Sequence, residues 1–95
     1  MFAASDYRLM WLRRLDALWL ARPDPTSLYG ADGLLAEMRA AIGEGSFDAA
    51  AANAALEGLI GVGEVLAVEV GEAELAVRIT RSGQARLARL EARPS

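Results

Sequence analysis

Two short segments of alternating apolar residues constrain the fold more than any other feature of the sequence. Residues 64–70 and residues 73–79 each carry an apolar side chain at every second position, which is typical of a half-buried strand. Gly71-Glu72 lies between them, where a tight turn joining two antiparallel strands would fall. The pattern predicts a β-hairpin in which Leu66, Val68 and Val70 alternate along the first strand and Leu75, Val77 and Ile79 along the second. Of these, Leu66, Val68, Leu75, Val77 and Ile79 are expected to lie in the core.

Helical periodicity covers most of the remaining chain. It predicts helices over residues 5–21, 31–42, 49–60 and 81–92. Ser5 or Asp6 is placed to cap the first helix, Asp48 the third, and Thr80 or Ser82 the fourth. No linker or repeat interrupts the chain, and 95 residues are enough for one core. We therefore expect a single domain over residues 1–95, mainly α with a two-stranded β-hairpin.

The first helix is apolar on two sides, whereas a surface helix needs only one apolar stripe. It is therefore expected to be buried either inside its own fold or against a second chain. The two tryptophans sharpen this alternative, because a small core rich in alanine needs large side chains, while aromatic anchors are typical of interface centres. We expect at least one tryptophan at a homodimer interface, and the candidate interface residues are Tyr7, Trp11, Leu15 and Trp19.

Charge is separated along the chain. The 10 basic residues are all arginine, against 13 acidic residues, for a net charge of −3. Residues 78–95 hold an arginine surplus, whereas residues 43–77 contain no base at all. This separation determines which surface could approach a polyanion. The acidic residues of the second segment are Glu44, Asp48, Glu57, Glu64, Glu69, Glu72 and Glu74.

The composition removes most enzymatic chemistry. Cysteine and histidine are both absent, so the chain has no disulfide, no thiol nucleophile, and neither the commonest general base nor the commonest metal ligand. Its serines have no histidine to activate them. No apolar run reaches the length of a membrane span, and no signal-peptide pattern opens the sequence. We expect a cytoplasmic protein that is not an enzyme and holds no cofactor or metal.

Two passages resemble winged helix-turn-helix proteins. Residues 79–87, from Ile79 through Thr80 and Gly83 to Leu87, are similar to the apolar-Thr-x-x-Gly-x-x-x-Leu passage of MarR- and PadR-type regulators. Residues 55–65 are similar to the x-L-x-x-L-x-x-x-G-x-V passage that ends a recognition helix. The sequence also resembles small winged-helix proteins of Mu-like phages and prophages. The resemblance implies a winged helix-turn-helix fold with the hairpin as its wing.

Such families usually bind duplex DNA, with the third helix in the major groove and the wing on phosphate. In this sequence the third helix offers Asn53 and Glu57 among alanines, and the wing tip offers only carboxylates. We therefore predict a module that acts through protein–protein contact, as a homodimer on an unidentified protein partner. The phage resemblance implies a modulator or inhibitor of a host complex. The alternative is a DNA-binding transcriptional regulator whose nucleic-acid-binding residues are Asn53, Arg78 and Arg81.

Overall fold

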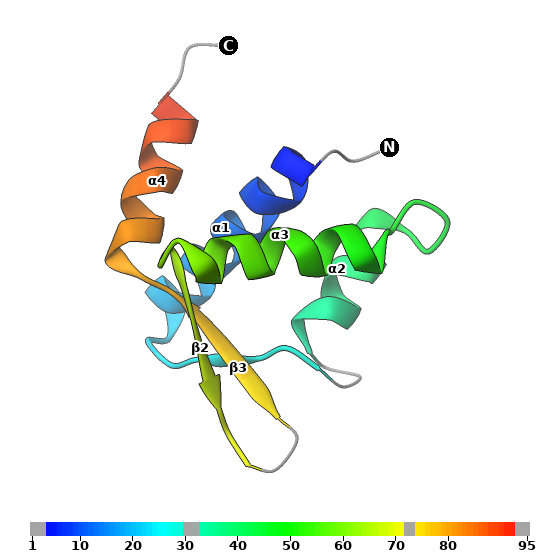
Figure 1. Ribbon diagram of the computed structural model, residues 1–95, viewed down its shortest axis with the longest axis horizontal. Coiled ribbons are helices and arrows are strands. Elements are labelled where there is room, and N and C mark those ends of the chain that lie inside the picture. Colours follow the sequence, from blue (N-terminus) through cyan, green and yellow to red (C-terminus); the bar gives the residue numbers. More distant parts are fainter. Residues whose placement is uncertain (1–3, 30–32, 72–73, 93–95) are drawn as a thin grey trace.

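The computed structural model describes residues 4–29, 33–71 and 74–92. Over these residues the chain is mainly helical, with a small antiparallel sheet from which the β2–β3 hairpin projects (Figure 1). The coarse fold class predicted from the sequence is confirmed, but the sheet has three strands instead of two. In chain order the elements are α1 (Ala4–Ala21), β1 (Thr26–Ser27), α2 (Leu34–Ile42), α3 (Ala49–Gly61), β2 (Val65–Glu69), β3 (Leu75–Ile79) and α4 (Arg81–Ala92).

Side-chain caps fix the starts of α3 and α4 where the sequence predicted them. Asp48 accepts a hydrogen bond from the Ala51 N–H at 3.1 Å. The Thr80 hydroxyl accepts from the Gly83 N–H at 3.1 Å and donates to the Gly63 carbonyl at 2.6 Å. Thr80, and not Ser82, is therefore the cap of α4. Because α1 already begins at Ala4, the prediction that Ser5 or Asp6 caps it is wrong.

Replacing Asp48 with alanine should lower the free energy of unfolding by about 0.5–2 kcal/mol, because the Ala51 N–H then loses its acceptor. Urea denaturation followed by circular dichroism measures this loss. Asp24→Ala is the matched control, since Asp24 pairs only with the exposed Arg22 and an exposed ion pair contributes little. Equal losses for the two variants would contradict the capping role.

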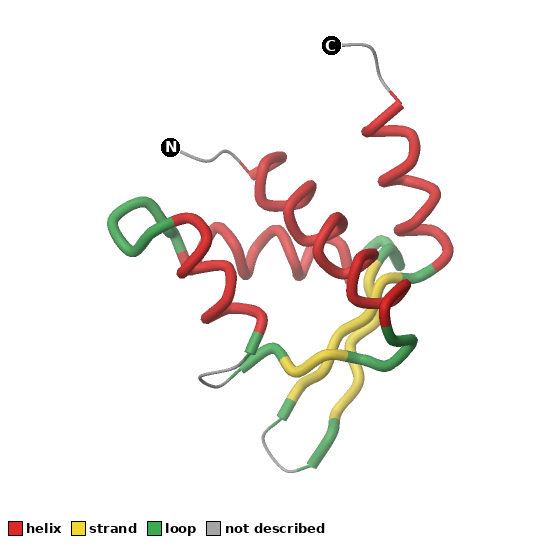
Figure 2. The backbone as a smooth tube through the Cα atoms, turned by 180° about the vertical axis from the view of Figure 1, so that it is seen from behind, coloured by secondary structure: helices red, strands yellow, loops and turns green. Residues whose placement is uncertain are grey.

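The third strand, β1, was not predicted. Thr26 pairs with Val77 and Ser27 with Ala76, and the Leu28 N–H donates to the Leu75 carbonyl at 2.9 Å. A strand of two residues is too short to show alternation in a sequence. Its pairing makes β3 the central strand in the order β1-β3-β2, which Figure 2 shows from behind.

The inward face of β2 is shifted by one residue from the prediction. Val65 is buried opposite Ile79, and Ala67 lies opposite Val77, so these side chains face the core. Leu66, Val68 and Val70 lie on the opposite face, where Leu66 is 42% exposed and Val70 is 48% exposed. The prediction that Leu66 and Val68 lie in the core is therefore wrong. A shift of one position sends every side chain of a strand to the opposite face.

The core forms around α1, which packs against α3, α4 and β3. The Trp11 indole N–H donates to the Ala52 carbonyl at 2.9 Å, and the Tyr7 hydroxyl accepts from the Asp48 N–H, also at 2.9 Å. The first bond joins α1 to α3, and the second joins α1 to Asp48, the residue that caps α3. The alanine-rich start of α3 leaves the room that these two aromatic side chains fill. Its buried residues are Ala52, Ala55, Leu56 and Leu59.

Candidate functional site

The four residues predicted to form a dimer interface do not share a surface. Tyr7 and Trp11 are 0% exposed, and Leu15 is also buried within the chain's own core. Their side chains leave no exposed area for a second chain to cover. For Tyr7, Trp11 and Leu15 the structure therefore supports burial in the chain's own core and not at a dimer interface. Trp19 differs from them, because it is only half-buried. Its ring lies beneath the Arg78 guanidinium, with 4.8 Å between the guanidinium carbon and the ring centroid.

The residues predicted for nucleic-acid binding are not brought together either. Asn53 is half-buried in the first half of α3, and the start of that helix lies away from α4 (Figure 1). Arg78 lies in β3, where its guanidinium donates to the Ile79 carbonyl at 3.2 Å as well as covering Trp19. Arg81 is exposed in the first turn of α4. Arg78 and Arg81 thus lie close in the chain, on either side of the junction between β3 and α4, while Asn53 lies on α3.

Four arginines pair with carboxylates among the described residues. The closest pair joins Arg14 to Glu37, with Nε to Oε2 at 2.7 Å and Nη2 to Oε1 at 2.6 Å. This hydrogen bonding, with the charge of Glu37, raises the pKa of Arg14 although partial desolvation opposes the shift. Each pair reduces the positive potential that the arginine would offer to a polyanion. The other pairs are Arg13–Glu91, Arg22–Asp24 and Arg86–Glu64.

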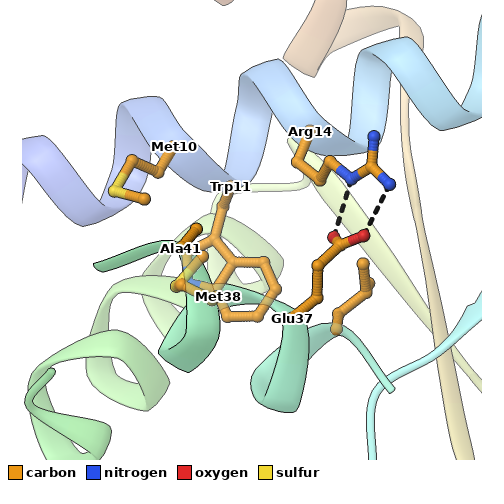
Figure 3. Close-up of a pocket in the computed structure, with 7 residues that line it drawn as sticks. Met10, Trp11, Arg14, Glu37, Met38 and Ala41 are labelled. Atoms are coloured by element: carbon orange, nitrogen blue, oxygen red, sulfur yellow. Dashed lines mark hydrogen bonds and ion pairs between the residues drawn. The ribbon is translucent and has the colours of Figure 1, made fainter. Parts of the chain in front are cut away.

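A cavity of about 180 Å³ lies between α1 and α2. Figure 3 shows the Arg14–Glu37 ion pair at one side and the apolar side chains of Trp11 and Met38 beside it. The cavity is smaller than the roughly 300–1,000 Å³ typical of small-molecule sites, so its size suits a single apolar side chain. Sequence reasoning missed it, because helical periodicity does not indicate which helices meet. Its lining residues are Met10, Trp11, Arg14, Leu34, Glu37, Met38 and Ala41.

The most exposed apolar surface of the sheet lies on β2. Its even-numbered residues, Leu66 and Val68, continue into Val70 and point away from the core, on a face that we call the outer face. Leu66 lies opposite Arg78 in register, so Trp19 adjoins this surface through Arg78. β2 is also an edge strand of the sheet. The outer face therefore combines exposed apolar side chains with an open strand edge.

No group of three or more acidic residues among the described residues is arranged to hold a metal ion. None of the helices in the described ranges is both long and apolar enough to cross a membrane.

Comparisons with known proteins found no match to this chain among family models, curated proteins or solved structures.

Proposed function

We propose that the protein is a non-enzymatic winged-helix module that acts through contact with other proteins. The element order supports the winged-helix part of the proposal. α2 and α3 are joined by a glycine-containing turn, as in a helix-turn-helix, and the β2–β3 hairpin follows in the position of a wing. Gly43 adopts a φ of 99° at the end of α2, a conformation that glycine provides at low cost.

The functional part of the proposal rests on one observation, which is the charge of the surface that a DNA-binding winged-helix protein would place against DNA. α3 would enter the major groove and the hairpin would touch phosphate. The exposed side chains of α3 are alanines and Glu57, and among the described residues of the hairpin the exposed carboxylates are Glu69 and Glu74. Phosphate neutralisation by Lys and Arg supplies most of the non-specific affinity for DNA. Among the described residues of α3 and the hairpin, the one such group is Arg78 in β3, which is half-buried with its guanidinium stacked on Trp19.

Exposed apolar residues favour a protein partner. Large apolar side chains at the surface are candidates for contact with another protein, particularly where several lie together. Leu66 and Val70 lie together on the outer face, and Val62 is exposed at the end of α3, just before β2. Leu66 and Val70 belong to the hairpin, which also carries Glu69 and Glu74, whereas Val62 lies before its base. The hairpin that disfavours DNA thus offers apolar area to a protein.

We expect no measurable binding to random duplex DNA at physiological salt, where proteins that bind DNA show non-specific Kd values of about 10⁻⁴–10⁻⁶ M. Carboxylates on α3 and the hairpin would repel phosphate within the Debye length of about 8 Å. Fluorescence anisotropy of a labelled duplex across a salt series measures the binding.

Two outcomes of the DNA experiment would contradict the proposal. Binding that falls steeply with salt and is lost in the double variant Arg78→Ala, Arg81→Ala would favour the regulator. Arg89→Ala is the control, because it removes an arginine of the last turn of α4. Binding that is lost on Asn53→Ala would mean that α3 enters the groove despite its alanines.

A further inference from the structure

The edge of β2 has unused backbone hydrogen-bonding groups at alternate residues. The Val70 N–H donates to the Glu74 carbonyl at 2.9 Å and the Thr80 N–H donates to the Glu64 carbonyl at 3.0 Å, so even-numbered residues of β2 bond to β3. In an antiparallel pair these bonds alternate along the strand. The polar groups of Val65, Ala67 and Glu69 therefore point away from β3. They take part in none of the turn, loop or cap hydrogen bonds between described residues.

The sequence of β2 offers little protection against pairing at this edge. Native proteins protect an edge strand with charged side chains, especially lysine, with proline, a bulge or a covering segment, because unpaired N–H and C=O groups are a template for another strand. The one charged side chain of β2 is Glu69, its last residue. The strand Val65–Glu69 contains neither lysine nor proline, and its register with β3 runs without a bulge. Its outward side chains, Leu66 and Val68, are apolar.

We propose that β2 pairs antiparallel with β2 of a second copy of this chain, forming one continuous sheet across a two-fold axis at Ala67. This proposal rests on the proposed role in protein contact and names the partner. In this register Ala67 pairs with its own counterpart, and Val65 pairs with Glu69 on each side of the axis. All unused groups of both edges are then satisfied, because each of these pairs exchanges two hydrogen bonds.

The side chains fit the same register. Leu66 lies opposite Val68 of the second copy in a non-hydrogen-bonded pair, where side chains on the same face approach most closely. Such apolar cross-strand pairs stabilise a sheet. A pairing centred on Glu69 would instead place two carboxylates opposite each other. The register centred on Ala67 places Glu69 opposite Val65 and avoids that repulsion.

Charge complementarity also favours a second copy. A two-fold axis perpendicular to the sheet keeps the core-facing sides of both chains on the same side. Glu69 of one copy then lies beside Val65 of the other, whose chain neighbour Glu64 lines a cavity together with Arg8 and Arg86. Glu64 pairs with Arg86 at 4.0 Å, so the two arginines and one carboxylate leave one positive charge there, that of Arg8. The acidic end of each hairpin thus approaches a site of opposite net charge, and the arrangement is repeated by symmetry.

The first test is the mass in solution between about 1 µM and about 1 mM, a range that spans Kd values for weak to moderate association. Light scattering should give a mass approaching twice 10.1 kDa at high concentration and 10.1 kDa on dilution. Leu66→Lys should leave only monomer, because each lysine would replace the apolar contact with Val68 of the second copy and the two positive charges would be diagonal neighbours across the axis. Leu20→Lys is the matched control, since Leu20 is exposed on α1, and it should dimerise as the natural protein does.

The second test uses the natural protein and locates the interface. Amide hydrogen exchange at Val65, Ala67 and Glu69 should be slow at high concentration and fast on dilution. The amides of Leu66, Val68 and Val70 should be protected at both concentrations, because they bond within the chain. A protein that remains monomeric, or a dimer in which the odd-numbered amides stay unprotected, would overturn the edge pairing. Neither result would alter the DNA experiment, which tests the proposed function separately.

Discussion

Replacing Trp11 with alanine should lower the free energy of unfolding by about 3–5 kcal/mol, the range for removing a large aromatic side chain from a core. The Trp11 side chain is fully buried, and it joins α1 to α3 through its hydrogen bond to the Ala52 carbonyl. The α3 surface around it is mostly alanine, and short side chains cannot move in to fill the space. Urea denaturation at a fixed protein concentration measures the loss.

Trp19→Ala is the matched control for this prediction. Trp19 lies two turns further along the same helix but is only half-buried, so the loss of stability should be clearly smaller. Removing it also frees the Arg78 guanidinium from its stacked position. Equal losses for the two variants would show that Trp11 is not the centre of the core. An unchanged stability of Trp11→Ala with a change only in association would restore the interface interpretation.

The contrast between the two tryptophans shows where sequence reasoning reached its limit. Periodicity placed Tyr7, Trp11 and Leu15 on one stripe of the first helix, and all three are buried. It could not decide whether the stripe faced the same chain or another. That decision depends on the small side chains of α3, which lie far away in the sequence. The predicted cap at Asp48 needed only local information, and it is confirmed.

The strand β2 was misread for a different physical reason. Four consecutive residues from Val65 to Val68 are apolar, so both phases of the alternation fit a buried face. The phase is set from outside the strand, by the pairing of Glu64 with Thr80 and by the Glu64 N–H bond to the Leu59 carbonyl. The phase also decides which backbone groups of β2 point away from β3, and therefore which groups could pair with a second copy. This edge could not be predicted from the sequence, because Leu66 was expected to lie in the core.

The other large prediction is that replacing glycine with alanine has opposite effects on the free energy of unfolding at two helical positions, Gly58 and Gly83. Alanine normally stabilises a helix interior relative to glycine by about 0.5–1 kcal/mol, because glycine loses more backbone entropy on folding. Gly58, in α3, follows this rule. A methyl group there would lie 3.6 Å from the Arg8 guanidinium, an ordinary contact with a flexible side chain. Gly58→Ala should therefore raise the free energy of unfolding by about that amount.

Gly83→Ala should instead destabilise the protein by about 1–3 kcal/mol or more, as overpacking does. A methyl group at Gly83 would overlap the Glu64 carbonyl oxygen and lie 2.7 Å from Ile79 Cγ1. The oxygen belongs to backbone that is already fixed by the bond from the Thr80 N–H, and α4 is held there by the Thr80 cap. Neither side can yield without loosening the junction between β2, β3 and α4. Thermal unfolding of both variants beside the natural protein measures whether each substitution raises or lowers the melting temperature. A Gly83→Ala variant that melts at a higher temperature than the natural protein would mean that α4 does not pack this closely on the start of β2.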